Sequence, residues 1–435
     1  MASCPPLHKN YSVNNFRSYF ALLSHNQQYR LLWISTVISQ LGNWFNYIAI
    51  SVLLTHLTGT GHAVSWFLIA KFVPPTILGP IAGVVADRFS KKNILIYCDV
   101  ARIFVVLGFL FVNSAGKVWL AYTLALIQES IWTFYDPAKY ASIPKLCREE
   151  QINIANALNG VTWSIMLSIG AALGGLATTL WGWKTAIILD SVSFLCSALL
   201  TKKIILQQTE AQQRNQGSLT AYLGMVDIIA GWHYIKNNRP VAVILAVKSG
   251  WALTGGVLVM LTIFGEQVLV SGMGNGWGSG ILYSFRGIGA AIGPILAWRL
   301  LGETNHAMHR GIAIAFFTAA ISYMLLSGAE NFSAAVFFVL IGNIGGATQW
   351  VFSTTLLQKV VSEGFLGRVV ATEMIFYSFS LCLSTYLTGL AIDEGVEPRL
   401  VMLILGALFC APGLAWLSFT SFGRYKIAHS SSPNL

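Results

Sequence analysis

The segment at residues 83–92 reads Gly-Val-Val-Ala-Asp-Arg-Phe-Ser-Lys-Lys and joins two apolar runs of the chain. A glycine near the end of the first run is followed four residues later by an acid and then by basic residues. Gly83 would let another helix approach closely, and Asp87 could accept hydrogen bonds from the exposed amides at that helix's N-terminus. The segment therefore predicts a helix contact that involves Gly83, Asp87, Arg88 and Lys92, although the basic residues alone could simply fix the orientation of the chain.

The two runs that flank this segment belong to a series that extends along the chain. Of the 435 residues, 55% are hydrophobic and only 10% are charged, whereas about 25% of a soluble domain is charged. A helix of about 20 apolar residues crosses a hydrocarbon core of roughly 30 Å. We expect an all-α membrane protein with twelve such helices, near residues 31–55, 63–86, 94–113, 118–138, 153–178, 184–201, 240–263, 278–300, 311–328, 334–357, 369–391 and 400–419.

The predicted helices form two sets of six that look related. The stretch from Tyr135 to Asn156 follows the fourth run much as the stretch from Val351 to Thr372 follows the tenth. Repeats of this kind are typical of transporters whose substrate site lies between two halves. We expect a cytoplasmic segment at residues 1–30, a six-helix bundle at 31–201, a cytoplasmic linker at 202–238, a second six-helix bundle at 239–420 and a cytoplasmic tail at 421–435.

The distribution of basic residues predicts the orientation of the chain. With a cytoplasmic N-terminus, the outer loops would hold only Lys117, Lys184 and Arg399 of the 27 lysines and arginines. Cytoplasmic loops carry the excess of basic residues in membrane proteins, so we expect both termini in the cytoplasm and the chain in the plasma (inner) membrane. Orientation also accounts for the net charge of +10 without a nucleic acid partner.

The segment at residues 83–92 resembles the signature loop of the major facilitator superfamily. Further motifs resemble the branch of that family that contains enterobactin exporters and macrolide-efflux proteins, and they occur in that branch's order: Ser39-Gln40-Leu41-Gly42, Leu57-Thr58-Gly59, Tyr135-Asp136-Pro137-Ala138 and Ala155-Asn156-Ala157-Leu158. The resemblance covers most of residues 30–420. It implies the major facilitator fold of two six-helix repeats, a cytoplasmic gate at residues 83–92 and an exporter's activity.

The chain departs from this branch at two positions. Asn43 stands where the branch usually has an acid, and Ala171 stands where the exporter pattern of helix 5 has a proline. Both departures concern residues tied to the coupling mechanism. The neighbouring glycines Gly170, Gly174 and Gly175 could instead form a face on which helices pack closely.

Among the ionisable residues within predicted spans, where charge is costly and marks a candidate functional site, five stand out: Lys71, Glu129, Lys248, Arg286 and Glu373. Burial disfavours the charged form of a carboxylate, so Glu129, near the middle of its span, is the first candidate for proton coupling. The alternative is a permanent ion pair with Lys248 or Arg286. We also expect Asp99 and Arg102, three residues apart, to pair, whereas Asp190 has no predicted partner.

The resemblance implies that helices 1, 4, 7 and 10 line a central cavity. Besides Glu129 and Lys248, these helices carry Gln40, Asn43, Trp44, Tyr47, Trp132, Trp251, Asn343, Gln349 and Trp350. A few polar groups among aromatic rings suit a sizeable amphiphile. Aromatic residues in spans also commonly serve only for packing.

These observations predict a secondary transporter and not an enzyme. The sequence has no Gly-x-x-x-x-Gly-Lys-Ser/Thr phosphate loop, and its eight histidines lie outside the predicted spans, so we expect no cofactor and no metal. We predict proton-coupled export of a hydrophobic or amphiphilic, drug- or siderophore-like molecule by a monomer that needs only substrate, gradient and bilayer. The alternatives are a lipid or lysolipid transporter and a non-transporting membrane sensor.

Overall fold

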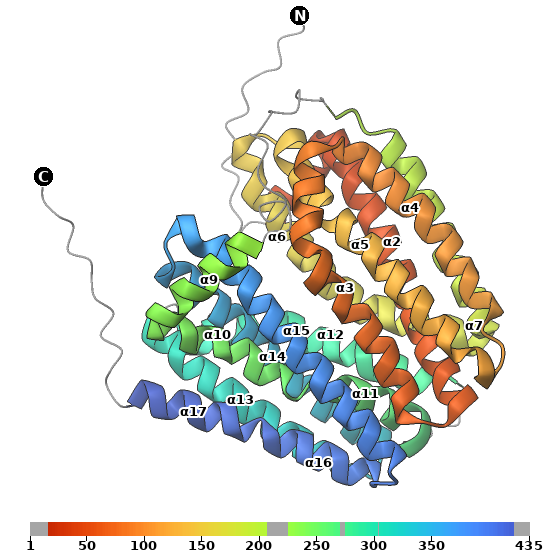
Figure 1. Cartoon of the computed structure of the whole chain (residues 1–435), viewed down its shortest axis with the longest axis vertical. Coiled ribbons are helices and arrows are strands. Elements are labelled where there is room, and N and C mark those ends of the chain that lie inside the picture. The colour runs from red at the N-terminus through yellow and green to blue at the C-terminus, as the bar shows by residue number, and fades with distance from the viewer. Residues whose placement is uncertain (1–15, 207–224, 270–274, 303, 422–435) are drawn as a thin grey trace, which may run out of the picture.

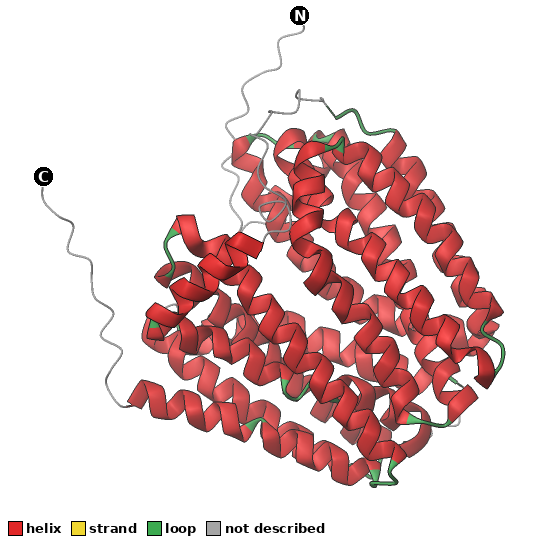
Figure 2. Cartoon of the chain, viewed as in Figure 1, coloured by secondary structure: helices red, strands yellow, loops and turns green. Residues whose placement is uncertain are grey.

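The computed structural model describes residues 16–206, 225–269, 275–302 and 304–421, which form helices and contain no strand (Figure 2). Figure 1 shows the helices gathered side by side into one body. The main helices are α1 (Phe16–His25), α2 (Gln27–Thr58), α3 (Gly61–Arg88), α4 (Lys91–Gly108), α5 (Val118–Leu146), α6 (Glu149–Ile165), α7 (Ala171–Lys202), α9 (Met225–Asn237), α10 (Arg239–Ala252), α11 (Val257–Ile263), α12 (Trp277–Leu301), α13 (Asn305–Ser327), α14 (Phe332–Val360), α15 (Glu363–Asp393), α16 (Pro398–Leu408) and α17 (Cys410–Ser421). Short turns η1 (Phe109–Phe111), η2 (Ala115–Lys117), η3 (Met166–Gly170) and η4 (Phe264–Val268) extend or link them.

Ten segments of the described chain are long and apolar enough to cross a membrane. One of them, Glu149–Lys202, contains two of the predicted spans. The backbone departs from helical geometry at Gly182, where φ is 79°, and this residue separates the two spans. α5 is not among the ten, and it carries the charged residues Glu129, Asp136 and Lys139. The all-helical, multi-pass membrane fold is therefore confirmed, and the count of twelve spans stays a prediction.

Two predicted helices are interrupted for local reasons. The run predicted at 240–263 breaks between α10 and α11 at Gly255 and Gly256, where the Gly256 amide donates to Ser384 Oγ of α15 at 3.0 Å. The run predicted at 400–419 breaks at Phe409. Pro412 follows this break, and its ring would clash with the carbonyl group four residues earlier in an unbroken helix. The predicted linker at 202–238 also contains a helix, α9.

The two halves of the chain repeat the same helix pairings. In the N-terminal half (α1–α7), α3 and α4 both pack on α5, and α2 and α4 pack on α7. In the C-terminal half (α9–α17), α12 and α13 both pack on α14, and α13 packs on α16. This correspondence fits the two related six-helix sets expected from the sequence.

The outer faces of several helices expose large apolar side chains. Phe104 is 70% exposed, Leu180 63% and Leu300 73%. Surface on this scale is unfavourable in water, but the same residues are in contact with hydrocarbon when the helix spans a bilayer. The outward apolar faces therefore agree with a protein embedded in lipid.

Candidate functional site

A cavity of about 710 Å³ lies between the two halves of the chain. Residues of α2 to α6 and η3 form one wall, and residues of α10, α11, α12, α14 and α15 form the other. Small-molecule sites in proteins commonly measure about 300–1,000 Å³. The cavity is therefore large enough for a drug-sized compound.

Most residues predicted to line a cavity do line this one: Gln40, Asn43, Trp44, Tyr47, Trp132, Trp251, Asn343 and Trp350. Gln349 is absent from the lining and is buried, with 1% of its surface exposed. The lining residues of α14 share one face of the helix, and at about 100° per residue Gln349 points away from that face. These residues are Asn343, Gly346, Ala347, Trp350 and Val351. The lining also includes Phe72, Trp163, Tyr283 and Tyr377, which sequence reasoning missed because they lie outside the four helices implied by the resemblance.

The halves touch closely at the end of the molecule that holds residues 59–62 and 389–397, which we call the closed end. Near the cavity, the hydroxyl groups of Tyr47 and Tyr283 are 2.7 Å apart and join α2 to α12. Gly175 of α7 meets the backbone of Gly280 in α12, where a Cβ added to Gly175 would lie 2.8 Å from the Gly280 Cα. Of the three glycines predicted to pack, Gly175 thus joins the two halves, whereas Gly170 and Gly174 pack on Trp44 within one half.

A carboxylate of the C-terminal half completes the closed end. Asp393, the last residue of α15, accepts a hydrogen bond from the backbone amide of Gly61 at 2.7 Å. Its other oxygen lies 2.5 Å from Nδ1 of His62. Because the first amides of a helix have no partner within the helix and attract anions, Asp393 caps α3 from the opposite half. No feature of the sequence pointed to this contact.

The predicted gate at residues 83–92 lies at the opposite end, which we call the open end. Figure 1 shows α3 and α15 together at the closed end and diverging toward the open end. Among the described atoms, none outside the local helix lies within 4 Å of the position of a Gly83 Cβ. Arg88 is exposed and Lys92 is partly buried, while the side chain of Asp87 lies outside the described residues. The helix contact expected at Gly83 is therefore not made in this conformation.

Glu129 forms an ion pair within the N-terminal half. Its Oε1 accepts a hydrogen bond from Nζ of Lys71, a residue of α3, and both side chains line the cavity. The two side chains are 15% and 19% exposed, respectively. The structure does not show the alternative pairing of Glu129 with Lys248 or Arg286, because Glu129 pairs with Lys71 and Lys248 pairs with Glu373.

Lys248 and Glu373 form a second ion pair, within the C-terminal half. Nζ of Lys248 donates to Glu373 Oε2 at 2.7 Å, and the side chains are 3% and 0% exposed. Neither residue lines the cavity, but Nζ lies 4.7 Å from the ring centre of Trp350, which does. Because the pair is buried and lies behind Trp350, it fits a structural role better than direct contact with substrate.

The remaining charges near the cavity belong to Arg102 and Arg286. Arg102 donates to Asp99 as predicted, and Asp99 also accepts from Ser197 at 2.6 Å. Arg286 lines the cavity at the middle of α12 and is only partly buried. Asp190, which had no predicted partner, is buried and lies 3.4 Å from Ser193 Oγ.

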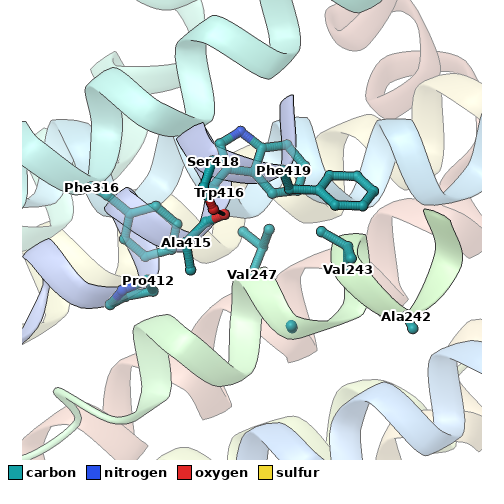
Figure 3. Close-up of a pocket in the computed structure, with 10 residues that line it drawn as sticks. Ala242, Val243, Val247, Phe316, Pro412, Ala415, Trp416, Ser418 and Phe419 are labelled. Atoms are coloured by element: carbon teal, nitrogen blue, oxygen red, sulfur yellow. Dashed lines mark hydrogen bonds between the residues drawn. The ribbon is translucent and has the colours of Figure 1, made fainter. Parts of the chain in front are cut away.

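A second pocket lies on the C-terminal half between α10, α13 and α17 (Figure 3). Figure 3 shows the rings of Phe316, Trp416 and Phe419 around it. The polar side chain in its lining is Ser418, whose hydroxyl donates to the backbone oxygen of Ala415 at 2.8 Å. Since a specific site needs polar groups that orient a ligand, the central cavity is the better candidate.

Comparisons with known proteins agree with this geometry. The model of the Major Facilitator Superfamily matches residues 32–385. Macrolide efflux protein A of Streptococcus pyogenes is 24% identical over 83% of this chain and 89% of its own length. A putative bacilysin exporter of Bacillus subtilis is 24% identical over 92% of this chain and 96% of its own.

A solved structure supports the same fold. The crystal structure of the nucleoside transporter NupG superposes with a TM-score of 0.69 at 13% identity, and the match covers 90% of this chain and 99% of that one. At this identity the likeness concerns the fold alone. Taken with the family match over residues 32–385, it shows that this chain belongs to the Major Facilitator Superfamily and is a multi-pass membrane transporter, not an enzyme.

Proposed function

We propose that the protein is a proton-coupled exporter of an amphiphilic small molecule that works by alternating access. The observation that carries the proposal is the cavity between the halves, which is lined by aromatic rings and by one ion pair and is closed at one end. Aromatic walls suit an apolar body, and the few polar groups would orient it. The efflux relatives add support for the direction of transport.

Glu129 is the residue through which protons would drive transport. Its pair with Lys71 lies in the cavity wall, where both substrate and water can reach it. Protonation of Glu129 would remove the charge that holds Lys71 and would leave a free cation facing the substrate. The charge of the cavity would then depend on the proton, which is the link that coupled transport requires.

Residues 83–92 would close the open end in the other half of the cycle. Asp393 at the end of α15 holds the first amides of α3 at the closed end. By the same geometry, Asp87 near the end of α3 would face the first residues of α15 when the open end closes. Gly83 would allow the close approach, and Arg88 and Lys92 would supply basic groups beside it.

The excess of basic residues at the open end supports an orientation with both termini in the cytoplasm of the cell. The described conformation would then be open toward the cytoplasm. An exporter loads its substrate in this state, from the cytoplasm or from the inner leaflet.

Transport by purified protein in proteoliposomes tests the proposal. A panel of dyes, macrolides and siderophores would be measured with and without an imposed proton gradient. We expect gradient-dependent movement that is lost in Glu129→Gln and retained in the control Glu330→Gln, because Glu330 is exposed and outside the cavity lining. If no compound moves, export of such molecules is refuted, and a lipid transporter or a sensor becomes the better account.

A further inference from the structure

The charges in the cavity wall do not balance. Lys71 is paired with Glu129, and Arg102 is paired with Asp99. The fourth charged residue of the lining is Arg286. No carboxylate of the described chain lies within 4.0 Å of its guanidinium group, so this cation is the charge left over.

The position of Arg286 suits contact with a ligand. It lies near the middle of α12 and is partly exposed to the cavity. The aromatic residues Tyr47, Tyr283 and Tyr377 line the same cavity. The next residue, Gly287, meets the backbone of Ser168 in the opposite half. Arg286 therefore lies beside a crossing of the two halves, in a cavity that aromatic rings line.

An unpaired cation at membrane depth is costly, and such residues normally face a partner or a pathway. A guanidinium group binds carboxylate and phosphate oxygens through two parallel hydrogen bonds, which are stronger than neutral ones. With this cation inside an aromatic cavity, we infer that the transported molecule is an amphiphilic anion whose carboxylate, sulfonate or phosphate group binds Arg286. This inference rests on the proposed function, since it names the substrate class of the same cavity.

A cavity that prefers cationic substrates would need a different arrangement of charged residues in its wall. The carboxylate of the lining, Glu129, already accepts from Lys71, so a cationic substrate would have to displace that lysine while its own charge stays near Arg286. An anion meets neither obstacle. Its apolar part would lie against rings such as Trp44 and Trp251, and its charge would complete the ionic balance.

Binding of two matched dyes to the detergent-purified full chain tests the inference. Fluorescein and rhodamine 123 share a xanthene ring system but carry opposite charge, and their anisotropy reports binding without transport. We expect fluorescein to bind more tightly than rhodamine 123. Arg286→Gln should weaken fluorescein binding by at least about tenfold, because a hydrogen bond to a charged group is lost, and it should not weaken rhodamine 123.

Two further variants keep the result interpretable. Arg286→Lys retains the charge without the paired donors and should fall between wild type and Arg286→Gln, whereas Arg310→Gln, an exposed arginine of α13 outside the cavity lining, should bind like wild type. Fluorescein that binds no better than rhodamine 123, or equally well to Arg286→Gln, would overturn the inference. Fluorescein that binds through Arg286 while no compound of the panel is transported would support an anion site at Arg286 and refute the proposed function.

Discussion

The contact between Gly175 and α12 leads to a prediction about the balance between conformations. A Cβ at Gly175 would lie 2.6 Å from the backbone oxygen of Gly276 and 2.8 Å from the Cα of Gly280. Both are backbone atoms, so no side chain can turn away. Since ordinary contacts of a Cβ begin near 3.4 Å, Gly175→Ala would force α7 and α12 apart by roughly 0.6–0.8 Å where they now touch.

Overpacking of this kind costs about 1–3 kcal/mol. The cost arises only while the closed end is closed, because the two helices belong to opposite halves. Gly175→Ala should therefore shift the equilibrium toward opening of this end by about 5- to 150-fold. The matched control is Gly79→Ala, since no described atom outside the local helix lies within 4 Å of that Cβ position.

Distances between nitroxide spin labels, measured by electron paramagnetic resonance, would detect the shift. Labels on cysteines at Thr60 and Glu394, both exposed at the closed end, should report mainly short distances in wild type and in Gly79→Ala. Gly175→Ala should populate a longer distance. An unchanged distance distribution in folded Gly175→Ala would refute the claim that this crossing opens during the cycle.

Three further predictions concern the open end, the closed end and the buried ion pair Lys248–Glu373. Gly83→Ala should shift the same distances in the opposite direction, toward a longer-lived closed end, because its Cβ is unhindered here and would obstruct only closure of the open end; a shift toward opening would contradict this. Asp393→Ala removes an ionic cap from α3 and should reduce the free energy that favours closure at the closed end by about 1.5–3 kcal/mol. The label distance between positions 60 and 394 should then lengthen, and an unchanged distance would show that the cap contributes little. Lys248→Met leaves the buried Glu373 without its cation and should lower the free energy of unfolding by about 3–5 kcal/mol in a denaturation titration. The double variant Lys248→Met with Glu373→Leu should recover much of that loss. Equal stability of the single and double variants would argue against the pair's burial.

The sequence predicted those features of the fold that depend on local composition. Apolar runs indicate spans because a helix satisfies its own backbone groups in lipid. The pair Asp99–Arg102 was predictable because residues three apart share a helix face. The break at Gly182 falls between the spans predicted at 153–178 and 184–201. The break at Phe409 was harder to place, since a single proline can be accommodated within a membrane helix when neighbouring helices compensate.

Contacts between helices were not predictable in the same way. Lys71 and Glu129 lie on different helices, so their pairing depends on how α3 packs against α5. The cap formed by Asp393 on Gly61 joins opposite halves of the chain. Tyr283 and Tyr377 were missed for the same reason, because composition does not reveal which of many aromatic residues face a common cavity.

The central claim is that the cavity opens to each side of the membrane in turn, and the accessibility of one cysteine tests it most directly. Ser164 of α6 lines the cavity and is partly exposed. Ser164→Cys would be made in a chain whose native cysteines are replaced by serine. Among the native cysteines, Cys98 and Cys147 are buried, and burial raises the pKa of the Cys147 thiol to about 12, which slows its reaction. Cys196, Cys382 and Cys410 are partly exposed and would react, so they must be replaced.

A membrane-impermeant maleimide would be applied to each face of oriented vesicles. Without substrate or gradient, labelling should occur from the face that carries the open end. With fluorescein and an imposed proton gradient, labelling from the opposite face should rise while labelling from the first face falls. Labelling from one face under every condition, or from both faces at once, would contradict alternating access.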